Sequence, residues 1–188
     1  MPLPFFPTPR RRRRDRLAAL PEAVRGELNA APPSPLAAPL LAGAAVGVAV
    51  ACGLGLFAWT SLPPDHIPSH FGPDGRADTW GGRSTLLIFP IMTLFLFGMM
   101  TLLTRSPATY NYPFAVTRDN ARRQATLAMG LVAWLRFATI WLMTYLEYGV
   151  IAAARDESAT LGVWFLPIVL LLIAAPVIGY FVAAWRGR

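Results

Sequence analysis

The sequence predicts an all-α integral membrane protein of four transmembrane helices, N-in/C-in, with an ordered extracytoplasmic loop between helices 1 and 2. Apolar residues make up 55% of the 188 residues and charged residues only 14%, and the mean hydropathy is +0.45. Soluble domains carry about 25% charged residues. Four long apolar segments account for the surplus of apolar residues. Each has at least about the 20 residues that a helix needs to cross a bilayer. The lipid bilayer is therefore the first expected partner.

The spans are expected near residues 39–60, 84–104, 127–154 and 161–185. All but the third are free of charge, whereas the third contains Arg136 and Glu147. Because this segment is longer than one bilayer crossing, part of its helix must project. Thr117 is the expected N-cap of a helix that starts near Arg118 and enters lipid near Trp134. Arg136 is then expected to snorkel to the inner interface.

Small residues recur every four positions in the first span. They are Gly43, Gly47, Ala51 and Gly55. Such a stripe allows another helix to approach closely in lipid, but ordinary small-residue membrane sequence gives the same pattern, and the sequence leaves both interpretations open.

The arginines predict the orientation. All 17 basic residues are arginines, and cytoplasmic segments of membrane proteins carry the excess of positive charge. With a cytoplasmic N-terminus, thirteen lie inside, namely Arg10 to Arg14, Arg16, Arg25, Arg105, Arg118, Arg122, Arg123, Arg186 and Arg188. Only Arg76, Arg83 and Arg155 lie outside. Both termini are therefore expected in the cytoplasm.

Two regions are expected, a disordered Arg/Pro-rich cytoplasmic tail over residues 1–35 and a membrane domain over residues 36–188. A segment with this composition cannot bury enough apolar surface to form a core. A short helix over residues 21–28 is compatible with it. Its arginines are expected to bind anionic lipids. A nucleic-acid partner is not expected, because no aromatic platform for bases accompanies the arginines.

The segment over residues 62–83 is the most chemically specific part of the chain. Its prolines and glycines require fixed turns, while Ile67, Phe71 and Trp80 are apolar groups that an unstructured linker would not need. We expect a compact loop that caps the helix bundle.

The loop also resembles a known family. The pattern is Leu62-Pro63, Ile67-Pro68-x-His70-Phe71 and Gly75-x-x-Asp78-x-Trp80-Gly81, followed by Arg83, a basic residue that opens a helix. It resembles the membrane module of domain-of-unknown-function family 1648, which also occurs in SdpI-type bacterial immunity proteins. The resemblance extends through Tyr110–Pro113 and Thr117–Gln124, and covers about residues 55–150. It implies a multi-pass protein of the bacterial plasma membrane.

This chain departs from the family at two places. Lysine is usual where Arg83 stands, and the C-terminal segment of full SdpI-type proteins is not evident after Ala154. For some members the family implies immunity toward a secreted toxic peptide, or signalling by holding a repressor at the membrane.

The candidate ligand-binding or structural residues of the loop are Pro68, His70, Phe71, Gly75, Asp78, Trp80 and Arg83. Our favoured interpretation is a structural pair of His70 and Asp78. A metal site from His66, His70, Asp74 and Asp78 is the alternative, but Pro68 between the histidines disfavours the helical turn that would align them. No cofactor is predicted. Catalysis would need a nucleophile, for which Ser69 and Ser84 are unspecific candidates.

Glu147 is the second informative charge, because an intramembrane carboxylate suggests a functional site. Arg136 lies about 16 Å away along the helix. Glu147 is therefore expected either to meet Arg76, Arg83 or His70 from the loop, or to reach the outer interface.

The function predicted from sequence is a binding or sensing module, or an SdpI-like immunity or signalling module, with a peptide or protein partner at the loop. Two alternatives stay open. One is a metal-dependent membrane enzyme that uses the loop, and the other is a structural subunit of a membrane complex.

Overall fold

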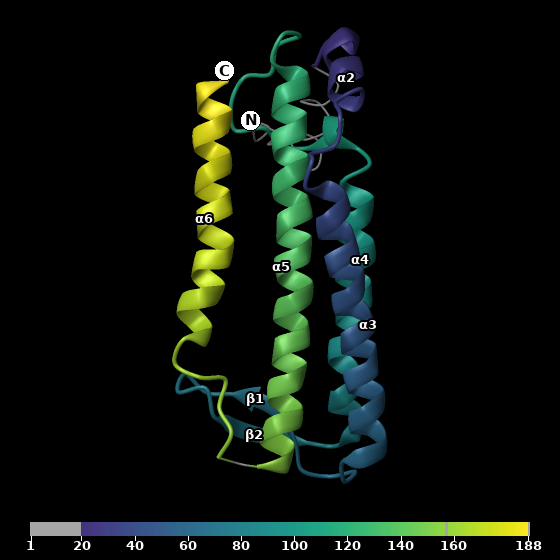
Figure 1. Ribbon diagram of the computed structural model, residues 1–188, viewed down its shortest axis with the longest axis vertical. Helices are drawn as coiled ribbons and strands as arrows, with labels where there is room; N and C mark the ends of the chain where they lie inside the picture. Colours follow the sequence, from purple (N-terminus) through teal and green to yellow (C-terminus); the bar gives the residue numbers. More distant parts are fainter. Residues whose placement is uncertain (1–19, 157, 188) are drawn as a thin grey trace, which may run out of the picture.

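The computed structural model describes residues 20–156 and 158–187, which form a helical bundle with one β-hairpin (Figure 1). Helix α2 spans Glu22–Asn29, α3 spans Ala37–Ser61, α4 spans Ile88–Leu103, α5 spans Ala121–Arg155 and α6 spans Phe165–Arg186. Strands β1, Ile67–Phe71, and β2, Ala77–Gly81, follow α3, and the 3₁₀ helices η1, Arg83–Leu87, and η2, Pro107–Thr109, flank α4.

Among the residues that the structure describes, four helical segments are long and apolar enough to cross a membrane, Ala37–Ser61, Arg83–Leu103, Ala121–Arg155 and Phe165–Arg186. They confirm the prediction of a mostly helical, multi-pass membrane protein. The fourth helix starts four residues later than expected, at Phe165, because the preceding residues form a turn in which Gly162 has a φ of +82°. That backbone conformation suits glycine and does not continue a helix.

Helix α5 is the central element of the bundle. Its 35 residues span about 52 Å, which exceeds a hydrocarbon layer of about 30 Å, and it contacts α2, α3, α4, α6, β1 and η2. It begins at Ala121 rather than at the expected Arg118. Thr117 and Asn120 explain the difference, because the Thr117 amide donates to Asn120 Oδ1 (2.8 Å) and the Asn120 amide donates to Thr117 Oγ1 (3.4 Å). These bonds hold the turn that precedes the helix.

The small-residue stripe of α3 packs against α5. A Cβ atom at Gly47 would stand 2.8 Å from Ile140 Cγ2, and one at Gly43 would stand 2.8 Å from Phe137 Cε2. At this distance the α3 backbone accepts hydrogen bonds from α5 side chains. Thr144 Oγ1 donates to the Gly47 carbonyl (3.2 Å), and Trp141 Nε1 donates to the Gly43 carbonyl (3.2 Å). The stripe is therefore a packing surface, which decides between the two interpretations of the sequence.

Residues 22–29, within the segment assigned to a disordered tail, form helix α2. Val24 and Leu28 lie on one side of α2 and are buried against Ala121 and Ala125 of α5. Glu27 adds an ion pair with Arg122 Nε at 2.6 Å. The helix exists because α5 projects far enough to supply an apolar face. The arginine run Arg10 to Arg16 lies outside the described residues.

Helix α6 is the most loosely packed of the four. Two of its carbonyls accept hydrogen bonds from α5 side chains. Gln124 Nε2 donates to the Ala184 carbonyl near the end of α6 (3.0 Å), and Trp134 Nε1 donates to the Leu172 carbonyl in the middle part of the helix (2.9 Å). Between α5 and the start of α6 lies an apolar hollow of about 490 Å³. Its α5 wall is the aromatic series Trp134, Phe137, Trp141 and Tyr145.

We expect Gly47→Leu to destabilise the protein and Gly53→Leu to leave it stable. A side chain at position 47 collides with Ile140, whereas a Cβ at Gly53 has no heavy atom within 4 Å. Overpacking of this kind costs about 1–3 kcal/mol. Thermal unfolding of the purified variants in detergent measures the difference. Equal melting temperatures for the two variants would contradict the observed α3–α5 contact.

Candidate functional site at the hairpin end

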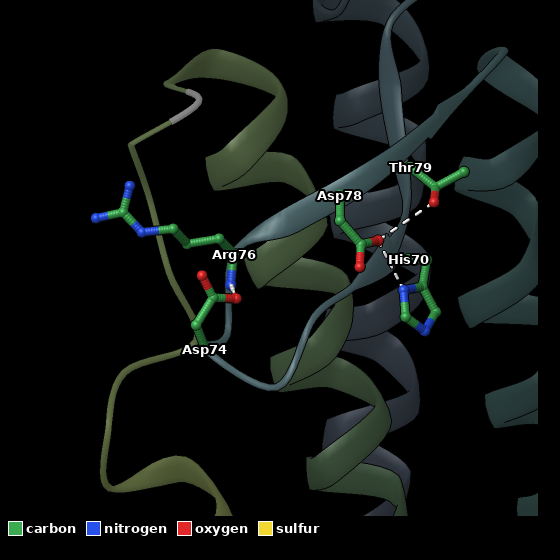
Figure 2. Close-up of polar contacts among 5 residues, drawn as sticks. All are labelled: His70, Asp74, Arg76, Asp78 and Thr79. Carbon is green, nitrogen blue, oxygen red and sulfur yellow. Dashed lines mark hydrogen bonds and ion pairs between the residues drawn. The ribbon is translucent and has the colours of Figure 1, made fainter.

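The loop folds into an antiparallel hairpin because its turn residues are suited to their positions. Gly75 accepts a φ of +74°, which glycine adopts at no steric cost, and its amide donates to the Gly72 carbonyl (2.9 Å). Pro73 fixes its own φ in the same turn. The Arg76 amide donates to Asp74 Oδ1 (3.1 Å), as Figure 2 shows. Asp74 is thus a turn residue.

The hairpin is anchored on the end of the bundle. Ile67 is fully buried in a cluster with Ala58, Leu62, Leu86, Val150 and Ile151, and Phe71 packs against this cluster. The other side of the turn is held by the α5–α6 connection, where the Leu161 amide donates to the Gly75 carbonyl (3.0 Å). The strands are therefore tied to three of the four long helices.

Arg83 joins the hairpin to the end of α3. Its Nη2 donates to the Leu62 carbonyl (2.9 Å), its guanidinium lies 5.5 Å from the centre of the Trp59 ring, and its amide donates to the Pro64 carbonyl (2.8 Å). The basic residue that the sequence pattern placed at a helix start does open η1. Its contacts are those of a structural residue.

His70 and Asp78 form the predicted pair across the two strands (Figure 2). The distance from His70 Nδ1 to Asp78 Oδ1 is 2.7 Å, and the side chains are 67% and 49% exposed. Since an ionised carboxylate can only accept, Nδ1 carries the donated proton. Thr79 Oγ1 also donates to Asp78 Oδ1 (3.2 Å). The hydrogen bond from His70, followed by its charge and the Thr79 bond, lowers the pKa of Asp78. The pair is thus presented to solvent.

His66 and Trp80 form a second contact that the sequence analysis missed. Their rings are stacked with centroids 4.0 Å apart and an interplanar angle of 6°. His66 also has a φ of +66°, which is uncommon for a residue other than glycine. The dense spacing of histidine, proline and tryptophan was the available signal. Trp80 therefore packs against His66.

The four weak metal candidates have separate roles. His66 stacks on Trp80, His70 pairs with Asp78, and Asp74 caps the turn. Over residues 20–156 and 158–187, no group of three or more His, Cys, Asp or Glu side chains is placed to hold a metal ion. Within the same residues neither Ser69 nor Ser84 hydrogen-bonds to His70. The exposed pair can bind a ligand through hydrogen bonds and charge.

The two intramembrane charges lie inside the bundle. Arg136 is 2% exposed, its Nη1 lies 3.4 Å from Thr101 Oγ1, and its guanidinium lies 6.0 Å from the Phe97 ring. It therefore contacts α4 instead of extending to the surface as expected. Glu147 is 1% exposed, and neither of its oxygens has a hydrogen-bond partner among the described residues. Both sequence expectations for Glu147, a loop partner or the outer interface, are wrong, because the carboxyl group is buried and lies against Gly55 of α3.

The fold and site together define a multi-pass membrane protein in which a hairpin with an exposed His–Asp pair closes one end of a helical bundle. Residues 46–94 match the family model described as Domain of unknown function (DUF1648), so this segment carries the domain that the loop pattern indicated. The match covers most of α3, the whole hairpin and the start of α4. Comparisons with curated proteins and with solved structures gave no match.

We expect the Asp78 carboxyl to titrate below the ordinary value of 3.8 because of its bond from His70. A lowered folded-state pKa means that the pair stabilises the hairpin fully above the ordinary value, and that this contribution is lost as pH falls through the folded pKa. His70→Ala should return the pKa toward its ordinary value, and Thr79→Val should shift it less. Carboxyl-carbon NMR titrations of aspartate-labelled protein measure both. An unchanged pKa in His70→Ala would show that the pair does not form.

Proposed function

We propose that this protein is a binding or sensing module of the bacterial plasma membrane, and that its hairpin recognises a peptide or protein outside the cell. The observation that carries the proposal is the exposed His70–Asp78 pair on an anchored hairpin. A connector between two spans has no need of strands docked on the bundle core. A surface fixed by the protein core loses little conformational entropy when a partner binds.

The arrangement of the ends supports an N-in/C-in orientation. The C-terminus and α2 lie at one end of the bundle, with the segment between α4 and α5, and the hairpin lies at the other (Figure 1). Among the described residues, six arginines belong to the first end, namely Arg25, Arg105, Arg118, Arg122, Arg123 and Arg186, and three belong to the hairpin end, namely Arg76, Arg83 and Arg155. By the positive-inside rule, this asymmetry supports a location of the hairpin outside the cell.

Two features of the hairpin suit an extended peptide. A two-stranded sheet leaves strand edges that can pair with a further strand. The imidazole and carboxylate of the pair add directional hydrogen-bonding groups next to that backbone. The α5–α6 connection already uses part of one edge, through the isolated bridge between Arg76 and Thr160. A further strand is therefore expected to add at the other edge of the hairpin, along β1.

The family resemblance suggests what the partner is. SdpI-type members imply immunity toward a secreted toxic peptide, and we propose the same class of ligand for this hairpin. The opposite end supplies a route for signalling or anchoring, because α2 is bound to α5 through Glu27 and Arg122. We propose that the arginine-rich segment preceding α2 binds anionic lipids there. The metal-dependent enzyme has less support, because the candidate ligands are engaged separately.

The experiment has two arms, and the first tests the location of the hairpin. Cys52 is the only cysteine, so Ser69→Cys and Ser106→Cys are made in a Cys52→Ser background as matched reporters of the two ends. A membrane-impermeant maleimide should label position 69 in intact bacteria, and position 106 only after lysis. Labelling of position 106 alone in intact cells would reverse the orientation and remove the proposal.

The second arm tests recognition. Cells that lack the protein, or that express the parent, His70→Ala/Asp78→Ala or Asp156→Asn, are exposed to purified secreted antibacterial peptides of the same species. The double variant should lose the parent's protection at equal membrane abundance. Asp156→Asn, a control at the same end but outside the hairpin, should keep it. Full protection by the double variant would contradict a recognition role for the pair.

A further inference from the structure

Glu147 lies at the place where three helices meet. Its Oε1 atom stands 3.0 Å from the position that a Cβ atom of Gly55 would take, and Cγ of Pro90 stands 3.1 Å from the same point. The carboxyl group is therefore enclosed by α3, α4 and its own helix α5, with 1% of the residue exposed. The glycine in the α3 stripe provides the space for it. Neither the His70–Asp78 pair nor the proposed recognition of a peptide uses this group.

No neighbouring group compensates a charge on Glu147. Both carboxylate oxygens are buried, and neither has a hydrogen-bond partner in the part of the chain that the structure describes. Helices α3 and α4 contain no acidic, basic or histidine residue at all. Within residues 20–156 and 158–187, no ion pair includes Glu147. This is unusual, because buried polar groups in native proteins are nearly always paired.

The charged and titratable groups on the surrounding elements are directed elsewhere. Arg83 of η1 binds the Leu62 carbonyl, His70 of β1 pairs with Asp78, Arg136 contacts Thr101, and Arg155 lies 4.9 Å from the Phe57 ring. The other titratable groups on these elements are Cys52 of α3 and, on α5, Tyr145, Tyr148, Arg122 and Arg123. The Tyr145 hydroxyl donates to the Leu161 carbonyl. Arg122 and Arg123 lie near the opposite end of α5, about 36 Å from Glu147 along the helix axis. Arg136 and Arg155 are about 16 Å and 12 Å from Glu147 along the helix axis.

The chemistry of this site selects its ligand. A bare carboxylate in a low-dielectric interior is far less favourable than a neutral acid. A divalent cation would require several oxygen ligands. Helices α3 and α4 contain no acidic or histidine residue, and among the described residues no group of three or more His, Cys, Asp or Glu side chains could hold a metal ion. A proton requires only the carboxylate itself. We propose that Glu147 is an intramembrane proton-binding site, whose proton must be bound for α3, α4 and α5 to pack closely at Gly55 and Pro90.

Loss of the proton has a structural consequence. A carboxylate anion at Glu147 would lie near the α3 backbone at Gly55 and the Pro90 ring. Among the described residues, no hydrogen-bond donor reaches its oxygens. Water must then enter between the helices, or the helices must separate. Thr93 of α4, one turn beyond Pro90, has a buried hydroxyl that also has no partner, and it provides a polar position along the same seam. Alkaline conditions should therefore loosen this end of the bundle.

The test compares the parent with Glu147→Gln, a neutral side chain of the same shape, in lipid vesicles. The melting temperature of the parent should fall relative to that of Glu147→Gln as pH rises from acidic to alkaline, and the two should agree at acidic pH. Glu27→Gln, which alters a carboxylate outside the membrane, should keep the parent's pH profile. Identical pH profiles for the parent and Glu147→Gln would overturn the proposal.

A second measurement decides the matter should Glu147→Gln fail to fold. Dicyclohexylcarbodiimide enters membranes and reacts with protonated carboxyl groups. The acid adds across the carbodiimide to give an O-acylisourea, which rearranges to an N-acylurea that retains the whole reagent mass. Labelling of the Glu147 peptide of the folded parent, followed by mass spectrometry, should fall about tenfold per pH unit above the titration midpoint. Labelling that is absent at acidic pH, or independent of pH, would overturn the proposal.

Discussion

The close approach of α3 to α5 is the constraint on which the rest of the structure depends. In lipid the hydrophobic effect does not drive helices together, so packing and hydrogen bonds must do so. Gly43 and Gly47 bring the α3 backbone within reach of Trp141 and Thr144, whose side chains donate to its carbonyls. The same register places Gly55 beside Glu147. One stripe of small residues thus fixes the helix pair and encloses the carboxyl group.

The contact between α3 and α5 also fixes the position of the hairpin. Ala58 and Leu62 at the end of α3 form one side of the cluster that buries Ile67, and Val150 and Ile151 of α5 form another. A shift of α3 against α5 would separate these two sides. The His70–Asp78 pair is therefore held at a fixed place above the bundle, although it is itself exposed. The α3–α5 contact therefore supports both the stability of the bundle and the position of the proposed recognition surface.

The helices could be predicted from the sequence because crossing a bilayer is a property of each segment's own residues. The His70–Asp78 pair could also be predicted, since both residues belong to one short loop. The burial of Glu147 could not, because it depends on Gly55 and Pro90, which lie far away in the sequence. Helix α2 was uncertain for a similar reason, since its apolar face is covered by Ala121 and Ala125. The His66–Trp80 stack depends on a left-handed backbone at His66 that no local pattern indicates.

The most direct test of this account is a solid-state NMR measurement of carbon–carbon proximity in vesicles, which requires no substitution. Gly47 Cα should give a cross peak to Ile140 Cγ2, and Gly55 Cα should give one to the side chain of Glu147. Gly53 Cα, on another face of α3, should give none to any α5 side chain. Cross peaks from Gly47 and Gly55 to lipid chains alone, without any to α5, would contradict the central role of this contact.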